Sequence, residues 1–367
     1  MEKIGILGGT FNPIHHGHLT VAEEVRCRLG LDYILLIPTG KPPHKKETTF
    51  SEHRYLMTRL AIEDNPRLRV SRIEIDREGM SYTVDTLRVL KEQTDADLFF
   101  IVGADEMNQI SSWRGADILP SLCKWVAVTR PGHSIQNALE IPAVDISSTE
   151  LRRRISEGKT IKYWLPSAVE RYIAEVGLNG EFEKIHKAVK AKLSEKRYKH
   201  TLGVIETSLI LAARHGVNMK KAYLAALLHD YAKEHSDKEK RKMCKQFGIQ
   251  LDSVQEENIG LIHGQLSAKL ANTEFGITDD EVLKAISFHT TGCIGMDSLG
   301  QLIKIADNIE PNRPDHPDLE KIKAVAKEDL VRGAIISIER DISYNIEKGK
   351  KVHHWSPEAL EYLRRQV

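Results

Sequence analysis

The chain has 367 residues, with 53 basic and 52 acidic side chains and a formal net charge of +1. This length is long for one domain and fits two of ordinary size. The balanced charge gives no reason to expect nucleic acid or an anionic membrane as a partner, because both favour a marked basic excess. We therefore expect small-molecule substrates.

Compartment signals are few. Four cysteines without a CxxC pair are too sparse for a disulfide framework and fit a reducing cytoplasm. No export signal is visible, and no apolar stretch approaches the ~20 residues that a membrane span needs. We expect a cytoplasmic protein.

Residues 1–180 alternate between strand-like apolar runs and amphipathic helical stretches. This rhythm is typical of an α/β, doubly wound, mostly parallel sheet whose ligands bind beyond the carboxyl ends of the strands. We expect strands at residues 4–7, 33–37, 69–75, 98–102, 125–128 and 143–146, and helices from Leu19 and over residues 168–176. The pattern breaks at residues 177–180, where we expect the first domain to end.

The first motif directly follows the first expected strand. Gly8 and Gly9 allow the backbone to turn sharply and approach a ligand closely. His15 and His18 are three residues apart, so both imidazoles can face the same anion from one side of a tight turn. A Gly-Gly pair alone is also common in ordinary strand-to-helix turns, so the whole segment, rather than the glycines, predicts a phosphate site.

Polar segments follow other expected strands. Lys41 and Lys45 lie in a proline-stiffened loop, where an exposed basic loop is the alternative interpretation. Thr83 lies at a helix start, where capping is a sufficient explanation. Gly103 and Asp105 end a strand, a pairing that allows a ribose or adenine to lie against backbone while the carboxylate accepts a hydrogen bond.

Three further elements complete the first half. Trp113 is by type more often a core residue than a ligand platform. Arg130 ends another strand. Ser147 and Glu150 form a capping box by sequence, yet a helix N-terminus beside the Arg152 guanidinium also suits phosphate. The hydroxyls of this segment belong to Ser147, Ser148 and Thr149.

Residues 8–18, GGTFNPIHHGH, resemble the signature of the nucleotidylyltransferase superfamily, and the flanking residues are similar to the bacterial nicotinate-nucleotide adenylyltransferases. The resemblance implies transfer of AMP from ATP, with Mg²⁺, to nicotinate mononucleotide, giving the dinucleotide and pyrophosphate. It implies catalysis by positioning and charge stabilisation through His15, His18 and Arg152. Nicotinamide mononucleotide or phosphopantetheine remains as an alternative acceptor.

The same resemblance implies the substrate contacts. Thr83 and Trp113 would contact the nicotinate end, the loop at Gly103 would bind ATP, and residues 147–152 would hold its β- and γ-phosphates. From the residues and the resemblance together, the full set of expected contacts is Gly8, Gly9, Thr10, Phe11, Lys41, Lys45, Thr83, Gly103, Asp105, Trp113, Arg130, Ser147, Ser148 and Thr149.

Residues 181–367 read as helical nearly throughout, so we expect an all-α second domain. A final helix should begin with Ser356 as N-cap and Pro357 at its first position. Histidines and aspartates recur in apolar helical contexts, where burial is costly unless they are paired or bind metal. These residues are His200, His229, Asp230, His263, His289 and Asp307.

One such histidine would be an ordinary core residue, but several across one bundle favour a metal site. Imidazole and carboxylate ligands suit Fe, Mn, Co or Zn. Asp230, adjacent to His229, can bridge two ions, and such a pair suits attack of hydroxide on phosphorus.

The pattern His200, His229–Asp230 and Asp307 resembles that of the HD-domain phosphohydrolases. With His263 and His289, it is similar to the branch that hydrolyses diadenosine tetraphosphate symmetrically to two ADP at a di-iron-type centre. The resemblance implies a catalytic Asp230 and a dinucleoside polyphosphate substrate.

Lys233 and Arg313 just past the ligand positions are expected phosphate contacts, with ordinary surface charges as the alternative. For the whole domain, the alternative is a nucleotide-sensing module that regulates the first domain without hydrolysis. A homo-oligomer is compatible with the sequence.

Overall fold

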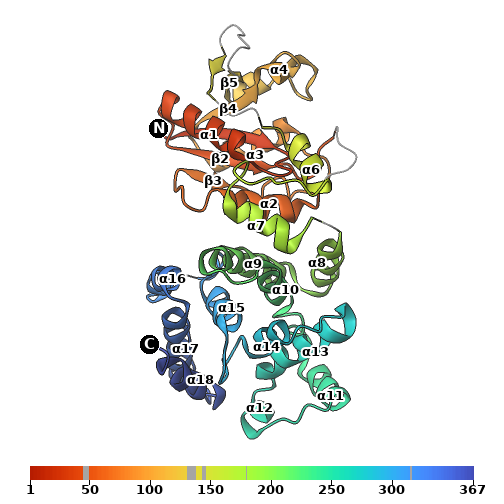
Figure 1. Cartoon of the computed structure of the whole chain (residues 1–367), viewed down its shortest axis with the longest axis vertical. Coiled ribbons are helices and arrows are strands. Elements are labelled where there is room, and N and C mark those ends of the chain that lie inside the picture. Colours follow the sequence, from red (N-terminus) through yellow and green to blue (C-terminus); the bar gives the residue numbers. More distant parts are fainter. Residues whose placement is uncertain (44–48, 130–137, 143–145, 179, 315) are drawn as a thin grey trace. The chain divides into compact units, whose positions relative to one another are not determined.

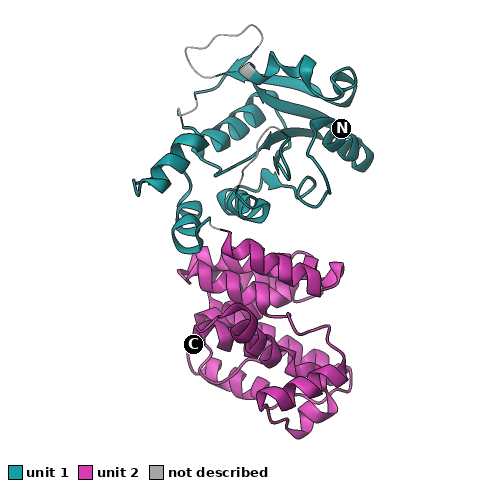
Figure 2. Cartoon of the chain, turned by 90° about the vertical axis from the view of Figure 1, so that its right-hand side faces the viewer, with its two compact units in different colours: residues 1–179 teal, residues 180–367 magenta. Residues whose placement is uncertain are grey.

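The structure, a computed structural model, divides into two compact units, Met1–Asn179 and Gly180–Val367 (Figure 2). It describes residues 1–43, 49–129, 138–142, 146–178, 180–314 and 316–367, without the side chain of Asp105. Each unit buries its own set of apolar side chains, as expected for chains of this length.

The first unit is built on a six-stranded sheet in the order β3-β2-β1-β4-β5-β6, in which every pair is parallel (Figure 1). This confirms the α/β, parallel-sheet prediction. The strands are β1 (Lys3–Gly9), β2 (Tyr33–Pro38), β3 (Leu68–Val70), β4 (Asp97–Gly103), β5 (Lys124–Thr129) and β6 (Leu139–Glu140). The helices are α1 (His16–Leu29), α2 (Ser51–Ala61), α3 (Thr83–Gln93), α4 (Ala104–Met107), the 3₁₀ helix η1 (Ile110–Ser112), α5 (Leu119–Leu122), α6 (Ser148–Ser156) and α7 (Ser167–Val176).

The strand order reverses between β1 and β4. The chain runs outward from β1 through β2 to β3, then returns to add β4 on the other side of β1. Leu7 pairs with Ile101, so the ends of β1 and β4, Gly9 and Gly103, lie at the same sheet edge. A reversal of this kind opens a crevice beyond the strand ends, where ligands bind in such sheets.

Several local expectations for the first unit are wrong. The third strand ends at Val70 instead of residue 75, because residues 73–75 form a turn. Helix α1 begins at His16, before Leu19, since His15 already has the extended backbone of an N-cap. Most of the expected strand at residues 143–146 lies outside the described residues, and Ile146 belongs to no strand.

The described part of the second unit contains helices and no strand, which confirms the all-α prediction. They are α8 (Glu181–Lys192), α9 (Glu195–His215), α10 (Met219–Leu228), α11 (Asp237–Phe247), α12 (Ser253–Glu257), the 3₁₀ helix η2 (Ile259–Ile262), α13 (His263–Phe275), α14 (Asp280–Phe288), α15 (Ser298–Ile309), α16 (Leu319–Glu328), α17 (Leu330–Glu347) and α18 (Trp355–Arg364). Helix α18 begins before Ser356, with His354 at the N-cap, so that capping prediction is wrong.

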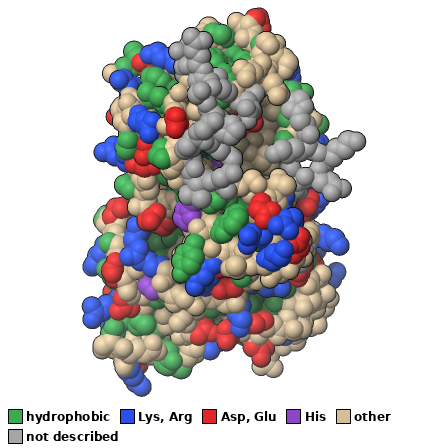
Figure 3. Space-filling model, turned by 45° about the horizontal axis from the view of Figure 1, so that its top comes forward, with side chains coloured by type: hydrophobic (Ala, Val, Ile, Leu, Met, Phe, Trp, Pro, Cys, Tyr) green, Lys and Arg blue, Asp and Glu red, His purple; other side chains and the backbone are tan. Residues whose placement is uncertain are grey.

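Surface charge is mixed on the face drawn in Figure 3, where basic and acidic side chains are interspersed. That pattern agrees with the near-zero net charge. Among the described residues, no helix has both the length and the apolar character needed to cross a lipid bilayer.

Candidate functional sites

In the first unit, the segment after β1 presents hydrogen-bond donors. The backbone N–H of His15 donates to His18 Nδ1 at 3.3 Å. The proton of a neutral His18 ring is therefore on Nε2, which can donate to an anion. The rings of His15 and His18 stack with centroids 3.7 Å apart, and Phe11 meets His18 edge-on at 5.1 Å.

Helix α6 is bonded to this loop although about 140 residues separate them in sequence. Ser148 Oγ donates to the carbonyl of Pro13 at 2.9 Å. Arg152 Nη1 donates to the carbonyl of Asn12 at 2.8 Å, and its Nη2 donates to Thr149 Oγ1 at 3.1 Å. The glycine loop and a helix N-terminus thus meet at one place, two elements that together favour an anion.

The N-terminus of α6 is only partly as expected. Ser147 Oγ accepts from the Glu150 N–H at 3.2 Å, as a cap should. The Glu150 carboxylate instead binds Arg153 and Arg154, so the reciprocal half of the expected capping box is not formed.

A residue that the sequence analysis missed holds the loops together. Arg54 in α2 is fully buried, and its guanidinium donates to the carbonyls of Thr10, Gly40 and Thr49, each at 2.9 Å. Burial lowers the pKa of Arg54 to about 10. The only signal in the sequence was an arginine inside an otherwise amphipathic helix, which is ordinarily a surface residue.

The loop after β2 is joined to the segment before α3. The Lys41 N–H donates to Ser81 Oγ at 3.1 Å, and the Ser81 N–H donates to the Lys41 carbonyl at 2.9 Å. Thr83 is the first residue of α3, where Tyr82 is the N-cap and no side chain caps the helix. Capping therefore does not explain Thr83, contrary to the simpler interpretation.

The remaining predicted residues of this unit fall into two groups. Trp113 is half-buried and contacts the rings of Phe100 and Trp125, with centroids 6.4 and 6.1 Å away, so it extends the core beside β4. Lys45, Arg130 and the side chain of Asp105 lie outside the described residues.

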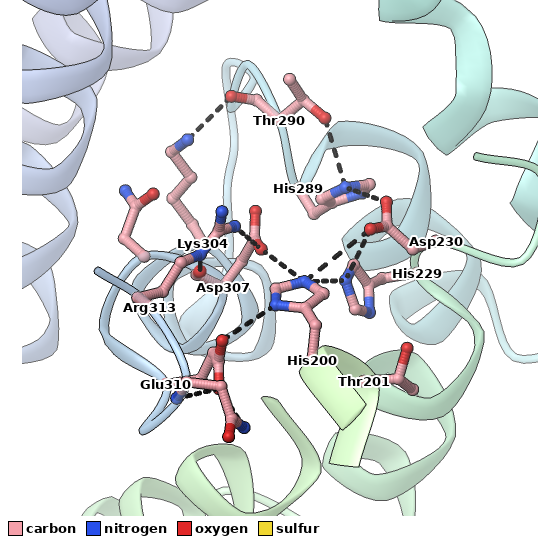
Figure 4. A network of polar contacts seen from close by, with 12 residues as sticks. His200, Thr201, His229, Asp230, His289, Thr290, Lys304, Asp307, Glu310 and Arg313 are labelled. Carbon is pink, nitrogen blue, oxygen red and sulfur yellow. Dashed lines mark hydrogen bonds and ion pairs between the residues drawn. The ribbon is translucent and has the colours of Figure 1, made fainter. Parts of the chain in front are cut away.

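In the second unit, the six predicted histidines and aspartates form one cluster centred on Asp230. Figure 4 shows its members other than His263. On one side, Asp230 Oδ2 lies 3.7 Å from His200 Nε2 and 3.5 Å from His229 Nε2. On the other side, Asp230 Oδ1 lies 3.1 Å from His263 Nε2 and 3.6 Å from His289 Nε2. Asp230 is thus positioned between two pairs of imidazoles.

Asp307 completes the first side. Its Oδ1 lies 3.1 Å from His200 Nε2, and the Nε2 atoms of His200 and His229 are 3.3 Å apart. On the second side, the Nε2 atoms of His263 and His289 are 3.1 Å apart.

Partners at Nδ1 fix the tautomers of these rings. The Nδ1 of His229, His263 and His289 faces the backbone carbonyl three residues earlier, at 2.7, 2.6 and 2.8 Å respectively. The Nδ1 of His200 faces Glu310 Oε1 at 3.1 Å. Because all four Nδ1–H groups donate outward, the four Nε2 lone pairs face inward.

The interior of this cluster therefore consists of acceptors. Four lone-pair nitrogens and two carboxylates face one another, and the buried Asp230 Oδ1 accepts no hydrogen bond from the described residues. These nitrogen and oxygen atoms repel one another unless cations lie between them. As metal ligands, they suit divalent transition metals. The residues fit a metal centre, with Asp230 as the ligand common to both sides.

The pKa shifts favour ionised carboxylates in this cluster. Against the effect of burial, hydrogen bonds to Asp307 and Glu310 raise the pKa of His200. Burial would raise the pKa of Asp230, but His229 and Lys233 hold it well below its usual range. Asp307 is lowered in pKa in the same way, chiefly by Arg313 and His200 against the effect of burial. Burial and the charge of Lys233 lower the pKa of His263 to about 3, so this ring is neutral.

Cationic side chains surround the cluster. Lys233 Nζ lies 3.1 Å from His263 Nε2, and Arg197 Nη1 donates to Asp230 Oδ2 at 2.8 Å. Arg313 Nε donates to the backbone carbonyl of Asp307 at 2.7 Å, and Arg313 Nη2 donates to the Asp307 carboxylate. Lys233 and Arg313 are therefore near the predicted ligands, while Arg197, one helical turn before His200, was not predicted as a site residue.

The sequence analysis also missed a hydrogen-bond network around the Asp230 cluster. Thr290 Oγ1 lies 3.2 Å from His289 Nε2 and 3.4 Å from His263 Nε2. The buried Lys304 donates to the Thr290 carbonyl at 2.7 Å and also binds Asp341 of α17. Helix α17 is thus connected to the cluster.

A third His/Asp group, Asp252, His353 and His354, differs in its protonation. The Trp355 N–H donates to His353 Nδ1 at 3.3 Å, which leaves the proton of a neutral ring on Nε2. That Nε2–H donates to Asp252 Oδ2 at 2.7 Å. The bond satisfies both groups, so this arrangement is a structural contact between α12 and α18.

Comparison with known proteins finds relatives of each unit. The family described as cytidylyltransferase-like matches residues 6–154, and the HD domain matches residues 197–312. Probable nicotinate-nucleotide adenylyltransferases from Arthrobacter sp. (strain FB24) and Tropheryma whipplei (strain Twist) are each 51% identical. Each match spans 47% of this chain. It covers 89% of the Arthrobacter protein and 97% of the Tropheryma protein. A solved Clostridium acetobutylicum structure, described as a predicted HD superfamily hydrolase involved in NAD metabolism, is 37% identical over 51% of this chain and 98% of its own, with a TM-score of 0.49.

The fold and sites thus define an enzyme with a nucleotidyltransferase domain followed by an HD domain. Through its first unit, the chain belongs to the nicotinate-nucleotide adenylyltransferase family.

Proposed function

We propose that the first unit transfers the adenylyl group of ATP to nicotinate mononucleotide. A phosphate oxygen of the mononucleotide attacks the α-phosphorus of ATP, the bond to the β-phosphate oxygen breaks, and pyrophosphate leaves. ATP would enter as its Mg²⁺ complex. The observation that carries this proposal is the bonding of α6 to the glycine loop at the point where the strand order reverses.

In this reaction the chain would act by orientation and charge. His18 Nε2–H would donate to a phosphate oxygen whose charge grows as the bond to the leaving group breaks. The α6 N-terminus and Arg152 would hold the departing phosphates, and Arg54 would keep the loops in register. No covalent intermediate is needed.

The acceptor is tested by competition. Equal concentrations of nicotinate and nicotinamide mononucleotides are incubated with ATP and the full chain, and the two dinucleotides are separated and counted. We expect the nicotinate product to predominate. A majority of nicotinamide product would overturn the choice of acceptor but leave adenylyl transfer intact, whereas no dinucleotide would overturn both.

For the second unit, we propose metal-dependent hydrolysis of dinucleoside polyphosphates, with water added across one phosphoanhydride so that diadenosine tetraphosphate gives two ADP. The convergence of four Nε2 lone pairs on Asp230 carries this proposal. A bound pair of divalent ions, for which iron, Mn, Co and Zn all suit the ligands, would supply Lewis acidity and a water of lowered pKa. Lys233 and Arg313 would orient the phosphates.

The alternative is a sensor that binds the nucleotide without cleaving it. The complete ligand set favours an enzyme, because a sensor does not need every ligand. Metal content is measured first, and the metal-loaded chain is then incubated with diadenosine tetraphosphate while ADP is monitored. Metal and ADP together support hydrolysis. Nucleotide binding without ADP release would favour the sensor.

A further inference from the structure

The two sides of the Asp230 cluster are not equivalent. We call the side formed by His200, His229 and Asp307 the His200 end, and the side formed by His263 and His289 the His263 end. At the His263 end, both Nδ1–H groups donate to neutral backbone carbonyls. At the His200 end, one of them donates to a carboxylate, Glu310.

The Glu310 carboxylate is fixed in an orientation in which one oxygen faces His200. It is buried, with 2% of its surface exposed. Its Oε2 accepts from the Asn312 backbone N–H at 2.7 Å and from Asn312 Nδ2 at 2.9 Å. Its Oε1 remains for His200 Nδ1 at 3.1 Å (Figure 4). A carboxylate satisfied on one side in this way cannot rotate without losing hydrogen bonds in a buried setting.

The neighbouring helix leaves room for this carboxylate. Gly203 lies in α9, and a Cβ at this position would be 2.1 Å from Glu310 Oε2 and 2.9 Å from Asn312 Nδ2. Any side chain larger than hydrogen would therefore displace Glu310 from His200. Glycine is unfavourable within a helix by about 1 kcal/mol relative to alanine, so its presence here has a steric reason.

The charges around the two ends differ in the same direction. Asp307 and Glu310 are carboxylates at the His200 end only, where they offset the charges of Arg197 and Arg313. At the His263 end, Lys233 Nζ lies 3.1 Å from a ligand nitrogen. A carboxylate behind a histidine raises the basicity of the ring, whereas a nearby ammonium opposes a second cation.

Resting on the metal centre of the proposed function, we propose that Glu310 is a positioning residue that makes the His200 end the higher-affinity metal position. The His263 end is then the weaker, exchangeable position, and the two ions bind in order.

The test follows Mn²⁺ binding to the full chain after chelator treatment, by equilibrium dialysis with the free ion counted by electron paramagnetic resonance. We expect two ions per wild-type chain, the first bound at least about tenfold more tightly. Glu310→Gln should weaken this first constant by about 10- to 100-fold, the range typical of partners behind metal ligands. His289→Ala should keep the tight ion and lose the weak one. Glu320→Gln, at an exposed glutamate of α16, is the matched control.

Gly203→Ala gives a second route to the same result, since it displaces Glu310 without removing its charge. If circular dichroism shows that Glu310→Gln does not fold, Gly203→Ala is used in its place. Two equal constants in the wild type, or an unchanged first constant in a folded Glu310 or Gly203 variant, would overturn the proposal. A chain that binds two ions in order but releases no ADP would overturn the proposed hydrolysis and leave this inference standing.

Discussion

The two sites have opposite electrostatic character. The first unit gathers donors at a sheet edge, namely the His18 Nε2–H, the α6 N-terminus and the Arg152 guanidinium, and so favours an anion. The second unit gathers acceptors inside a helical bundle, four imidazole lone pairs and two carboxylates, and so favours cations. The first site therefore suits the anionic substrate proposed for it, whereas the proposed hydrolysis at the second would require bound metal.

They also differ in how backbone and side chains contribute. In the first unit, the loops are set by carbonyls that bind Arg54, and the position of the site follows from strand order. In the second, the four histidines lie on four different helices or helix ends, and each ring is oriented by what faces its Nδ1. A single substitution should therefore disable one unit without affecting the other.

The largest effect is expected for His229→Ala, which removes a ligand at the centre of the acceptor cluster. Metal binding should fall below one ion per chain, and hydrolysis of diadenosine tetraphosphate should drop by about 10³-fold or more, since a metal ion contributes several kcal/mol to such a step. Dinucleotide synthesis by the first unit should be unchanged. Both activities and the metal content are measured on the same preparation.

The matched control is His354→Ala, an exposed histidine of the third His/Asp group. Its metal content should equal that of the wild type. If His354→Ala lost an ion, or His229→Ala kept both, the assignment of the metals to the Asp230 cluster would be wrong.

His18→Ala should abolish the opposite activity. Loss of one donor to a developing phosphate charge costs about 10²- to 10³-fold in rate, and dinucleotide formation should fall at least that far while circular dichroism is unchanged. His16→Ala, a neighbouring histidine of α1, should keep most of the activity. Undiminished turnover by His18→Ala would remove this ring from the site.

The sequence was more informative about the first unit because its motif is contiguous. Residues 8–18 follow one strand, so their role could be predicted without knowing the fold. The His200 to Asp307 set was also predicted, because histidines are unusual in apolar helices. Arg54, Glu310 and Lys304 were missed, since a buried charge looks like a surface charge until its partners, which lie far away in sequence, are known.

Helix ends were less predictable for a related reason. Ser356 and Thr83 have good capping side chains, yet His354 and Tyr82 are the N-cap residues, because packing decides where each chain segment turns. The glycine loop shows the same limit: the sequence indicated an anion site, but its bonds to α6 depend on the whole sheet.

An intermediate effect is expected for Arg54→Met, which removes the donor of three partly buried carbonyls. Bonds to charged groups contribute about 1.5–3 kcal/mol each, and partial relaxation should leave a loss of roughly 3 kcal/mol in the free energy of unfolding of the first unit. Dinucleotide synthesis should fall through a raised KM, and unfolding of the second unit should not change.

Arg59→Met is the matched control in the same helix, where the guanidinium is paired with Glu63 and both side chains are partly exposed. It should cost less than about 0.5 kcal/mol. The free energies of unfolding are measured by denaturant titration. Equal losses from the two substitutions would show that Arg54 has no special role in joining the loops.

The smallest effect tests whether the third His/Asp group is structural. Asp252 caps α12 by accepting from the Val254 and Gln255 N–H groups at 2.9 Å, and it also accepts from His353. Burial is the largest single influence and raises the pKa of Asp252, but these hydrogen bonds together hold it below its ordinary 3.8. A carboxyl whose pKa is lower in the folded state stabilises the fold above pH 3.8, and this contribution is lost as the pH falls through the folded-state pKa.

Asp252→Ala should therefore destabilise the second unit by about 1 kcal/mol at pH 7, and the difference from wild type should shrink below pH 3.8. Asp252→Asn keeps a capping oxygen and should lose less. Unfolding free energies are compared across pH in chelator-treated protein, and Mn²⁺ is counted at pH 7. Because the Nε2 proton of His353 is already donated to Asp252, neither variant should change the metal count. A lost ion would make this group a third metal position and end its contrast with the Asp230 cluster.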